Sequence, residues 1–202
     1  MNPIAMLPSP VRAVAEILLT LLVAAGIAYL AQAFVVKPYR VPTGSMIPTL
    51  KPGDRVIADR LSLDFSDPTR GEIVVFHPPI CSGSNNASGA CTTPNLSLRV
   101  GTSPVTFIKR VIGLPGETVW AKGGHVWVQD PGGKPQRLDE PYVKGQATPR
   151  FPKTVIPSRC YFMMGDNRIS SDDSRTWGCE PRGDILGIAR VRYWPLSRLG
   201  IL

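Results

Sequence analysis

The longest apolar run in the chain lies near its N-terminus. Residues 17–36 carry no formal charge, and as an α-helix with a rise of about 1.5 Å per residue they would span about 30 Å, the thickness of a bilayer core. Helix signals surround this run: Ser9 suits a cap, Pro10 suits the first turn, and Pro38 cannot continue the helix. The pattern predicts a short N-terminal segment over residues 1–16 and a transmembrane anchor over residues 17–36.

Two features of this segment leave its processing and its orientation open. Ala31, Gln32 and Ala33 match the small-x-small pattern of a signal-peptide cleavage site, so cleavage between Ala33 and Phe34 is one alternative. The apolar run is longer than the core of a typical signal peptide, which favours a retained anchor. Basic residues occur on both sides of the run, so positive-inside counting does not decide which side of a membrane carries the rest of the chain.

After residue 37, short apolar or alternating runs replace the helical pattern. Period-two alternation between clusters of turn-forming residues predicts β-strands. The expected strands lie at residues 55–58, 72–76, 106–112, 118–121, 125–129, 161–164 and 185–194. Gly123 and Gly124 suit a hairpin turn because both accept a positive φ. The fold class is therefore mainly β, an antiparallel sheet domain over residues 37–202 with one N-terminal helix.

Two long polar stretches interrupt these strands. Residues 78–104 are rich in Ser, Asn, Gly and Thr, which predicts a surface loop. Residues 132–157 are polar with spaced prolines, which predicts an irregular arm of a smaller lobe at about 118–160. The 21 prolines and 19 glycines of the chain agree with a loop-rich β architecture.

All four cysteines, Cys81, Cys91, Cys160 and Cys179, follow the apolar run. An even number suggests two disulfides in an extracytoplasmic domain, and the simplest pairing joins Cys81 to Cys91 and Cys160 to Cys179. Zinc binding is the alternative, but no C-x-x-C pair occurs and only two histidines are present to assist. We therefore expect no metal and no other cofactor.

The formal net charge of +8 implies an anionic partner. Lys and Arg are scattered, and neither a basic run nor an aromatic RNA-binding signature is present. Nucleic acid is therefore not an expected partner, and membrane lipids are the better interpretation. The residues do not define an oligomeric state.

Catalysis by a serine–histidine pair would have to use His77 or His125. Neither lies beside a nucleophile motif such as G-x-S-x-G. A more suitable nucleophile is Ser45, in a loop where Pro42 and Pro48 limit the backbone. Taken alone, this loop fits a rigid turn near the bilayer equally well.

A base other than histidine lies on one of the expected strands. Alternation places Lys109 on the same face as Phe107 and Val111. A lysine among apolar neighbours loses hydration of its charged form, so its pKa should fall and the neutral amine can accept a proton from a serine. The competing interpretation is a strand-end lysine that extends to water. Residues 165–178 form a dense polar loop, which suits either the orientation of a base or an ordinary turn network.

Three motifs follow the apolar run in a fixed order. They are P-T-G-S-M-x-P-T-L at residues 42–50, F-I-K-R-V-I-G-L-P-G-E at residues 107–117 and G-D-N-R-x-x-S-x-D-S-R-x-W-G at residues 165–178. Together they resemble the bacterial type I signal peptidases, and the likeness covers most of residues 17–195. It implies a signal-peptidase-like antiparallel β fold and a membrane-anchored serine endopeptidase. Such an enzyme cleaves signal peptides from exported preproteins through a Ser/Lys dyad and an acyl-enzyme intermediate.

The resemblance implies roles for individual residues. Ser45 matches the nucleophile and Lys109 the general base, while the Ser45 backbone N–H and the Thr43 hydroxyl match the oxyanion hole. Ser171 matches a hydroxyl that orients the lysine. Two pairs are expected to support the site structurally, Asp173 with Arg175 and Arg110 with Asp166. The candidate substrate-lining residues are Val41, Pro42, Met46, Leu50, Phe107 and Ile108.

The resemblance also implies a location and a binding mode. We expect a single-pass protein of the cell membrane, with the catalytic domain on the extracytoplasmic side. The substrate is expected to lie extended along a strand edge, with small side chains at the first and third positions before the cut. Two positions depart from the family, since Ile169 replaces a frequent acidic residue and Asp172 occupies a position near the cleft that is often small.

Two alternatives stay open. An organellar processing enzyme would use the same Ser–Lys chemistry, whereas a self-cleaving repressor would need a DNA-binding domain where this chain has its apolar run. A non-catalytic β domain that binds envelope partners is an alternative of another class. Absence of Ser45-dependent cleavage of a preprotein would favour it.

Overall fold

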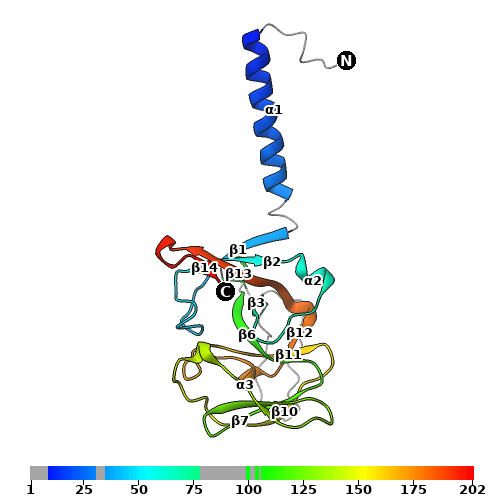
Figure 1. Ribbon diagram of the computed structural model, residues 1–202, viewed down its shortest axis with the longest axis vertical. Coiled ribbons are helices and arrows are strands. Elements are labelled where there is room, and N and C mark those ends of the chain that lie inside the picture. The colour runs from blue at the N-terminus through cyan, green and yellow to red at the C-terminus, as the bar shows by residue number, and fades with distance from the viewer. Residues whose placement is uncertain (1–8, 31–34, 78–98, 101–102, 105) are drawn as a thin grey trace.

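The computed structural model describes residues 9–30, 35–77, 99–100, 103–104 and 106–202. One long helix, α1 (Ser9–Leu30), extends away from a body made of β-sheets (Figure 1). In the structure Ser9 and Pro10 are the first two residues of this helix.

The apolar run does not continue as a helix to its expected end. Val36 opens β1 (Val36–Arg40), where it lies opposite Asp59 in an antiparallel ladder, so the predicted span of residues 17–36 is too long at its C-terminal end. Residues 31–34, with the Ala33–Phe34 bond, lie outside the described residues. Among the residues that the structure describes, no helix is both long and apolar enough to cross a membrane.

The body contains a larger antiparallel sheet of eight strands (Figure 1). Its strands lie in the order β1, β2 (Arg55–Asp59), β13 (Ile185–Trp194), β3 (Ile73–Phe76), β6 (Phe107–Gly113), β11 (Cys160–Met164) and β12 (Glu180–Pro181), and β14 (Gly200–Ile201) pairs with β13. In the register of this sheet, Lys109 of β6 lies opposite Val74 of β3. The strand that carries Lys109 is therefore an inner strand, held by neighbours on both sides.

A smaller antiparallel sheet forms the end of the body that is remote from α1 (Figure 1). Its four strands lie in the order β10 (Phe151–Val155), β7 (Thr118–Lys122), β8 (His125–Gln129) and β9 (Gln136–Arg137). The predicted hairpin turn joins β7 to β8, with φ of 63° at Gly123 and 82° at Gly124. Strand β10 was not predicted, because Pro152 and the polar residues around it interrupt the apolar pattern of this edge strand.

The remaining elements are short. They are the helices α2 (Ser62–Phe65) and α3 (Ser174–Trp177), the 3-10 turns η3 (Pro141–Val143), η4 (Arg182–Asp184) and η5 (Leu196–Arg198), and the strand pair β4 (Arg99–Val100) and β5 (Ser103–Pro104). All seven expected strands are present, within two residues of their predicted limits. The fold class, mainly antiparallel β with one N-terminal helix, is therefore confirmed. Most of the predicted loop at 78–104 lies outside the described residues.

The centre of the larger sheet is buried on both faces. Along β3, Ile73 and Val75 belong to one apolar cluster, and Val74 and Phe76 belong to another cluster on the opposite face. Such double burial explains why this strand reads as a continuous apolar run instead of an alternating one. A third cluster, which includes Phe162 of β11, joins the larger sheet to the smaller one.

One disulfide lies within the described residues. It joins Cys160, at the start of β11, to Cys179, next to β12, with a Cα–Cα distance of 5.7 Å. This is one of the two pairings predicted from the sequence, and it ties the strand before the polar loop to the strand after it. Cys81 and Cys91 lie outside the described residues, so their pairing stays a prediction.

Candidate active site

Ser45 lies in the connection between β1 and β2, residues 41–54, which we call the nucleophile loop. Three buried side chains, Val41, Met46 and Leu50, hold this connection against the sheet, with exposed fractions of 2%, 1% and 0%. The Val41 backbone N–H donates to the Asp54 carbonyl at 2.8 Å, which closes the base of the loop. The serine is therefore fixed by apolar residues on both sides of it in the sequence, and its own side chain is nearly buried.

Lys109 reaches Ser45 from the inner strand β6. Its Nζ lies 2.6 Å from Ser45 Oγ, although 64 residues separate the two in the sequence. The lysine is only 4% exposed. Thr43 Oγ1 lies 3.3 Å from the same serine oxygen. The structure therefore brings together the three residues that the sequence indicated as nucleophile, base and oxyanion donor.

Burial lowers the pKa of the Lys109 amine from 10.5 to about 8. Loss of hydration is the main cause of this shift. The charges of Asp173, Asp172 and Asp166 oppose it, and Arg175 reinforces it. A substantial fraction of the amine is therefore neutral near pH 8, and its lone pair can accept the Ser45 proton.

The polar loop after β11 packs directly on the backbone of the nucleophile loop. The Asn167 N–H donates to the Ser45 carbonyl at 3.0 Å, and its side-chain amide donates to the Gly44 carbonyl at 3.3 Å. Gly165 lies so close to the Ser45 carbonyl and to Ser171 that a Cβ atom would fall within 3.0 Å of both. Gly165 was not among the predicted site residues, although its motif contains it. It allows the two loops to touch.

Ser171 does not make the expected contact with the lysine. Its Oγ is buried and has no hydrogen-bond partner among the described residues. The orienting hydrogen bond to Lys109 is therefore absent from this structure. The cause is the position of this hydroxyl, which packs against Gly165 instead.

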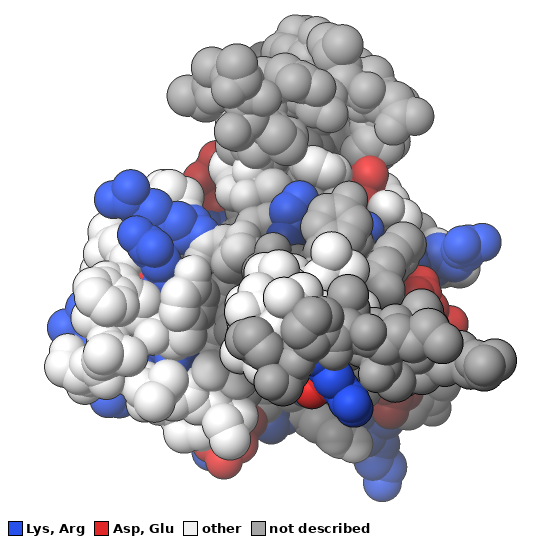
Figure 2. Space-filling model, turned by 90° about the horizontal axis from the view of Figure 1, so that it is seen from above, with Lys and Arg blue, Asp and Glu red and all other residues white. Residues whose placement is uncertain are grey.

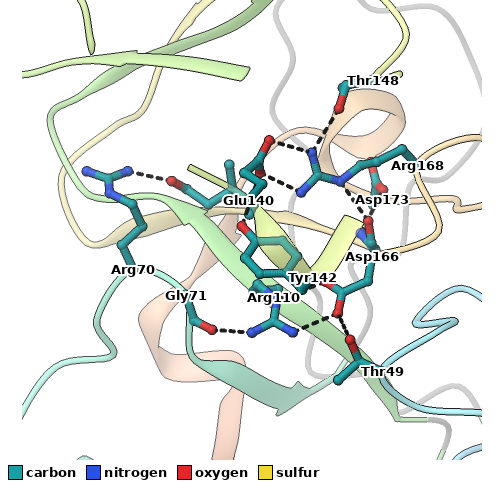
Figure 3. A network of polar contacts seen from close by, with 12 residues as sticks. Thr49, Arg70, Gly71, Arg110, Glu140, Tyr142, Thr148, Asp166, Arg168 and Asp173 are labelled. Atoms are coloured by element: carbon teal, nitrogen blue, oxygen red, sulfur yellow. Dashed lines mark hydrogen bonds and ion pairs between the residues drawn. The ribbon is translucent and has the colours of Figure 1, made fainter. Parts of the chain in front are cut away.

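Both predicted supporting ion pairs are formed, and the carboxylate of each pair is fully buried. Arg110 donates to Asp166 through Nε at 2.8 Å and Nη2 at 2.7 Å, and the Thr49 hydroxyl donates to the same carboxylate (Figure 3). Arg175 donates to Asp173 at 2.7 Å and 2.8 Å. Two donors in parallel hold each carboxylate in one orientation. The first pair joins β6 and the polar loop to the nucleophile loop, because Thr49 belongs to the same loop as Ser45.

A third ion pair was not predicted. Arg168 donates from Nη2 to Glu140 at 2.6 Å and from Nη1 to Thr148 at 2.9 Å, and its Nε donates to the Gly165 carbonyl at 3.0 Å (Figure 3). Figure 3 also shows the Tyr142 ring beside Arg110, whose Cζ lies 3.9 Å from the ring centroid. These contacts attach the polar loop to the arm between β9 and β10. The sequence of this arm shows no regular pattern. Its Glu140-Pro141-Tyr142 cluster was the one signal that could have indicated these contacts.

A cavity of about 260 Å³ opens beside Ser45 and Lys109. We call it the Ser45 cavity, and its lining residues are Val41, Pro42, Thr43, Gly44, Ser45, Met46, Phe107, Ile108, Lys109, Ser170 and Asp172. Five of the six predicted lining residues are present. Leu50 does not line this cavity, and its side chain is fully buried in the apolar cluster that also contains Val41 and Met46. His77 and His125 do not line the cavity.

The polar groups of the site are of few kinds. One lysine amine, several hydroxyls and carboxylates paired with arginines make its contacts. In the part of the chain that the structure describes, no group of three or more His, Cys, Asp or Glu side chains is placed to hold a metal ion. An amine beside a serine hydroxyl suits nucleophilic catalysis with a lysine base.

In this antiparallel β body a serine hydroxyl faces a buried lysine. This arrangement is typical of one class of protein, the serine peptidases that use a lysine base. The sequence profile of the family described as "Signal peptidase, peptidase S26" matches residues 14–194. The chain therefore belongs to the signal peptidase family, peptidase S26.

The first two of the following matches, both to named signal peptidases, agree with this assignment. A signal peptidase I of Leptolyngbya laminosa is 40% identical over 169 residues, which cover 84% of this chain and 74% of that protein. A probable signal peptidase I-1 of Synechocystis sp. is 37% identical over 196 residues, which cover 97% of this chain and 90% of that protein. A crystal structure of a signal peptidase I from Enterococcus faecalis V583 is 25% identical, covers 61% of this chain and 97% of that chain, and superposes with a TM-score of 0.43.

Proposed function

We propose that this chain is a membrane-anchored serine endopeptidase that removes signal peptides from exported preproteins. The observation that carries the proposal is the distance of 2.6 Å between Lys109 Nζ and Ser45 Oγ in a member of the signal peptidase family. Relatives that match most of this chain are named signal peptidase I. The proposal assigns Ser45 as the nucleophile and Lys109 as the general base.

Acylation begins with a proton transfer. Neutral Lys109 accepts the Ser45 hydroxyl proton, and the serine oxygen attacks the carbonyl carbon of the scissile peptide bond. The negative charge that develops on the carbonyl oxygen is stabilised by the Ser45 backbone N–H and the Thr43 hydroxyl. In related chemistry, one such donor lowers the activation free energy by about 3 kcal/mol. The position of Thr43 Oγ1, 3.3 Å from the nucleophile, supports this assignment.

The same lysine then serves the second half of the reaction. The Lys109 ammonium gives its proton to the leaving amine as the peptide bond breaks, which leaves an acyl ester on Ser45. A water molecule then gives its proton to the neutral amine and attacks this ester. Collapse of the second tetrahedral intermediate returns the proton to Ser45 Oγ and releases the new carboxyl terminus.

The shape of the Ser45 cavity agrees with small substrate side chains. Val41, Phe107 and Ile108 form apolar parts of its wall, and its volume of about 260 Å³ accommodates small side chains more readily than several large ones. An extended substrate backbone would run along the strand edge beside these residues, in the manner of an added β-strand. We therefore infer a preference for small residues such as alanine close to the scissile bond.

Three features support a position at a membrane surface. Apolar side chains of α1 are solvent-exposed along the helix, for example Leu18 at 61% and Leu22 at 71%, and the helix extends free of the body (Figure 1). A second apolar surface lies at the C-terminus, with Leu196 70% exposed and Ile201 88% exposed. Burial of such surfaces in lipid would be favourable. Figure 2, which looks down on the end that carries α1, shows Lys and Arg at several separate places on this face, interspersed with Asp and Glu, and the basic side chains suit anionic headgroups.

The proposed side of the membrane is the extracytoplasmic one. The disulfide between Cys160 and Cys179 supports this, because disulfides persist in oxidising compartments. We also propose that the apolar part of α1 anchors the chain there and that residues 37–202 act as the catalytic domain. Alkaline extraction of isolated membranes, followed by protease treatment of intact spheroplasts, tests both statements. Recovery of the chain in the washed supernatant would contradict the anchor.

The decisive experiment compares preprotein cleavage by three purified forms of the full chain in detergent. Wild type should release a signal peptide, whereas Ser45→Ala and Lys109→Met should release none at equal concentration. Lys109→Met keeps the length of the side chain but removes the amine, so its failure reports on the base. Activity that survives in Ser45→Ala, or no cleavage by any form, would overturn the proposal and favour a non-catalytic binding domain.

A further inference from the structure

Among the described residues, Asp172 is the one carboxylate that lines the Ser45 cavity. Its side chain is exposed, and no described residue donates a hydrogen bond to it or forms an ion pair with it. Its neighbours in the loop differ sharply. Asp173 and Asp166 are fully buried, and each is bound by two donors of one arginine.

Asp166 and Asp173 therefore have structural roles, whereas Asp172 is available to interact with a substrate. Asp166 and Asp173 have their charges compensated by Arg110 and Arg175, so they contribute little uncompensated charge to the cavity. Asp172 brings a negative charge to a wall whose other parts include Val41, Phe107 and Ile108. Beside apolar walls a charge interacts more strongly than in open water. A substrate side chain that enters the cavity will therefore meet a negative potential from this residue.

We propose that Asp172 is a specificity-determining residue that favours substrates with a cationic or hydrogen-bond-donating side chain next to the scissile bond and disfavours acidic ones there. The inference deepens the proposed function and rests on it. It assigns a role to a residue that takes no part in proton transfer. Small neutral residues still fit the cavity, and Asp172 ranks the charged and polar ones.

The same carboxylate acts on the base. The charged groups around the Lys109 amine are Asp173, Asp172, Arg175 and Asp166, and the three aspartates stabilise its ammonium form. Of these four, Asp172 alone also lines the cavity. Removal of its charge should lower the pKa of Lys109 and shift the acidic limb of the pH–rate profile to lower pH. A residue with a purely structural role would leave that limb in place.

The test uses full-length enzyme in detergent and a set of signal-peptide substrates that differ only in Lys, Ala or Glu at each position flanking the cut. Wild type should cleave the Lys substrate with a higher kcat/KM than the Glu substrate at one position. An exposed carboxylate acting on two opposite charges should change this ratio by about fivefold to tenfold. Asp172→Asn should bring the ratio of kcat/KM for the Lys substrate to that for the Glu substrate close to one, and Asp172→Glu should retain the wild-type ratio. Added salt should weaken it in wild type.

Asp130→Asn is the matched control, because Asp130 is also exposed, follows β8 in the smaller sheet and does not line the cavity. It makes the same change in net charge and should leave both the Lys/Glu ratio and the pH profile unchanged. Equal loss of kcat/KM on all three substrates in Asp172→Asn, with an unshifted acidic limb, would overturn the inference while leaving the proposed function intact. Failure of wild type to cleave any substrate would overturn both.

Discussion

Gly165 offers a direct test of how the site is held together. Its backbone is not in the left-handed region, so a side chain is opposed there only by space. A Cβ at this position would fall within 3.0 Å of the Ser45 carbonyl oxygen and of Ser171. Ordinary carbon contacts need 3.4–4 Å. Because both neighbours are packed and one is backbone, Gly165→Ala must push the nucleophile loop away from the polar loop.

The size of the effect follows from that displacement. Separation to ordinary contact requires a movement of about 1 Å, and a misplacement of this size costs about 100-fold in rate when it affects reacting groups. The Asn167 N–H bond to the Ser45 carbonyl, now 3.0 Å, would also lengthen. Crowding in a packed region costs about 1–3 kcal/mol of stability. We therefore expect a folded protein with a large defect in kcat.

The assay is a comparison of kcat, KM and thermal unfolding for Gly165→Ala and Gly183→Ala. A Cβ added at Gly183 would meet no atom within 4 Å, and the backbone there has no positive φ, so the control substitution should be neutral in both measurements. Wild-type kcat in a folded Gly165→Ala enzyme would refute the reasoning. A loss of kcat equal in both variants would show that the close contact with Ser45 is not its cause.

Further predictions concern charges. Lys109→Arg should abolish turnover, measured with a fluorogenic peptide, because a guanidinium does not release its proton at working pH. In wild type, kcat/KM should rise with pH and level off above about pH 8, since burial lowers the pKa of Lys109 to that value; an inflection near ~6.5 that disappears in a His77→Ala/His125→Ala variant would point to histidine instead. Burial raises the pKa of Glu180 to about 9, and neither carboxyl oxygen has a hydrogen-bond partner among the described residues. The folded state thus keeps a proton that the unfolded state releases above pH 4.5, so stability should fall between pH 4.5 and 9 by up to about 1.4 kcal/mol per pH unit; urea titrations of Glu180→Gln should lack this slope. Glu140→Gln should cost about 3 kcal/mol in the same titrations, because it removes the charge that compensates buried Arg168, and an unchanged midpoint would contradict that account.

Some residues of the site could be predicted from the sequence, and others could not. Ser45, Lys109 and Thr43 were found because their residue types and motif positions carry chemistry that few other residues in the chain offer. Leu50 was assigned to the cleft because it shares the motif, yet it packs into the core below. A motif shows that residues belong to one functional unit and does not show which of them face the solvent.

The sequence by itself determined seven of the strands, the hairpin at Gly123 and Gly124, and the order of the three motifs. These features depend on local patterns of burial and backbone freedom, which neighbouring residues encode. Only the tertiary structure decided that Arg168 pairs with Glu140, that Ser171 turns to Gly165 and not to the lysine, and that Asp172 stays unpaired on the cavity wall among the described residues. The physical reason is that each of these outcomes depends on which loops pack together over β6, and such packing joins residues that are far apart in the chain.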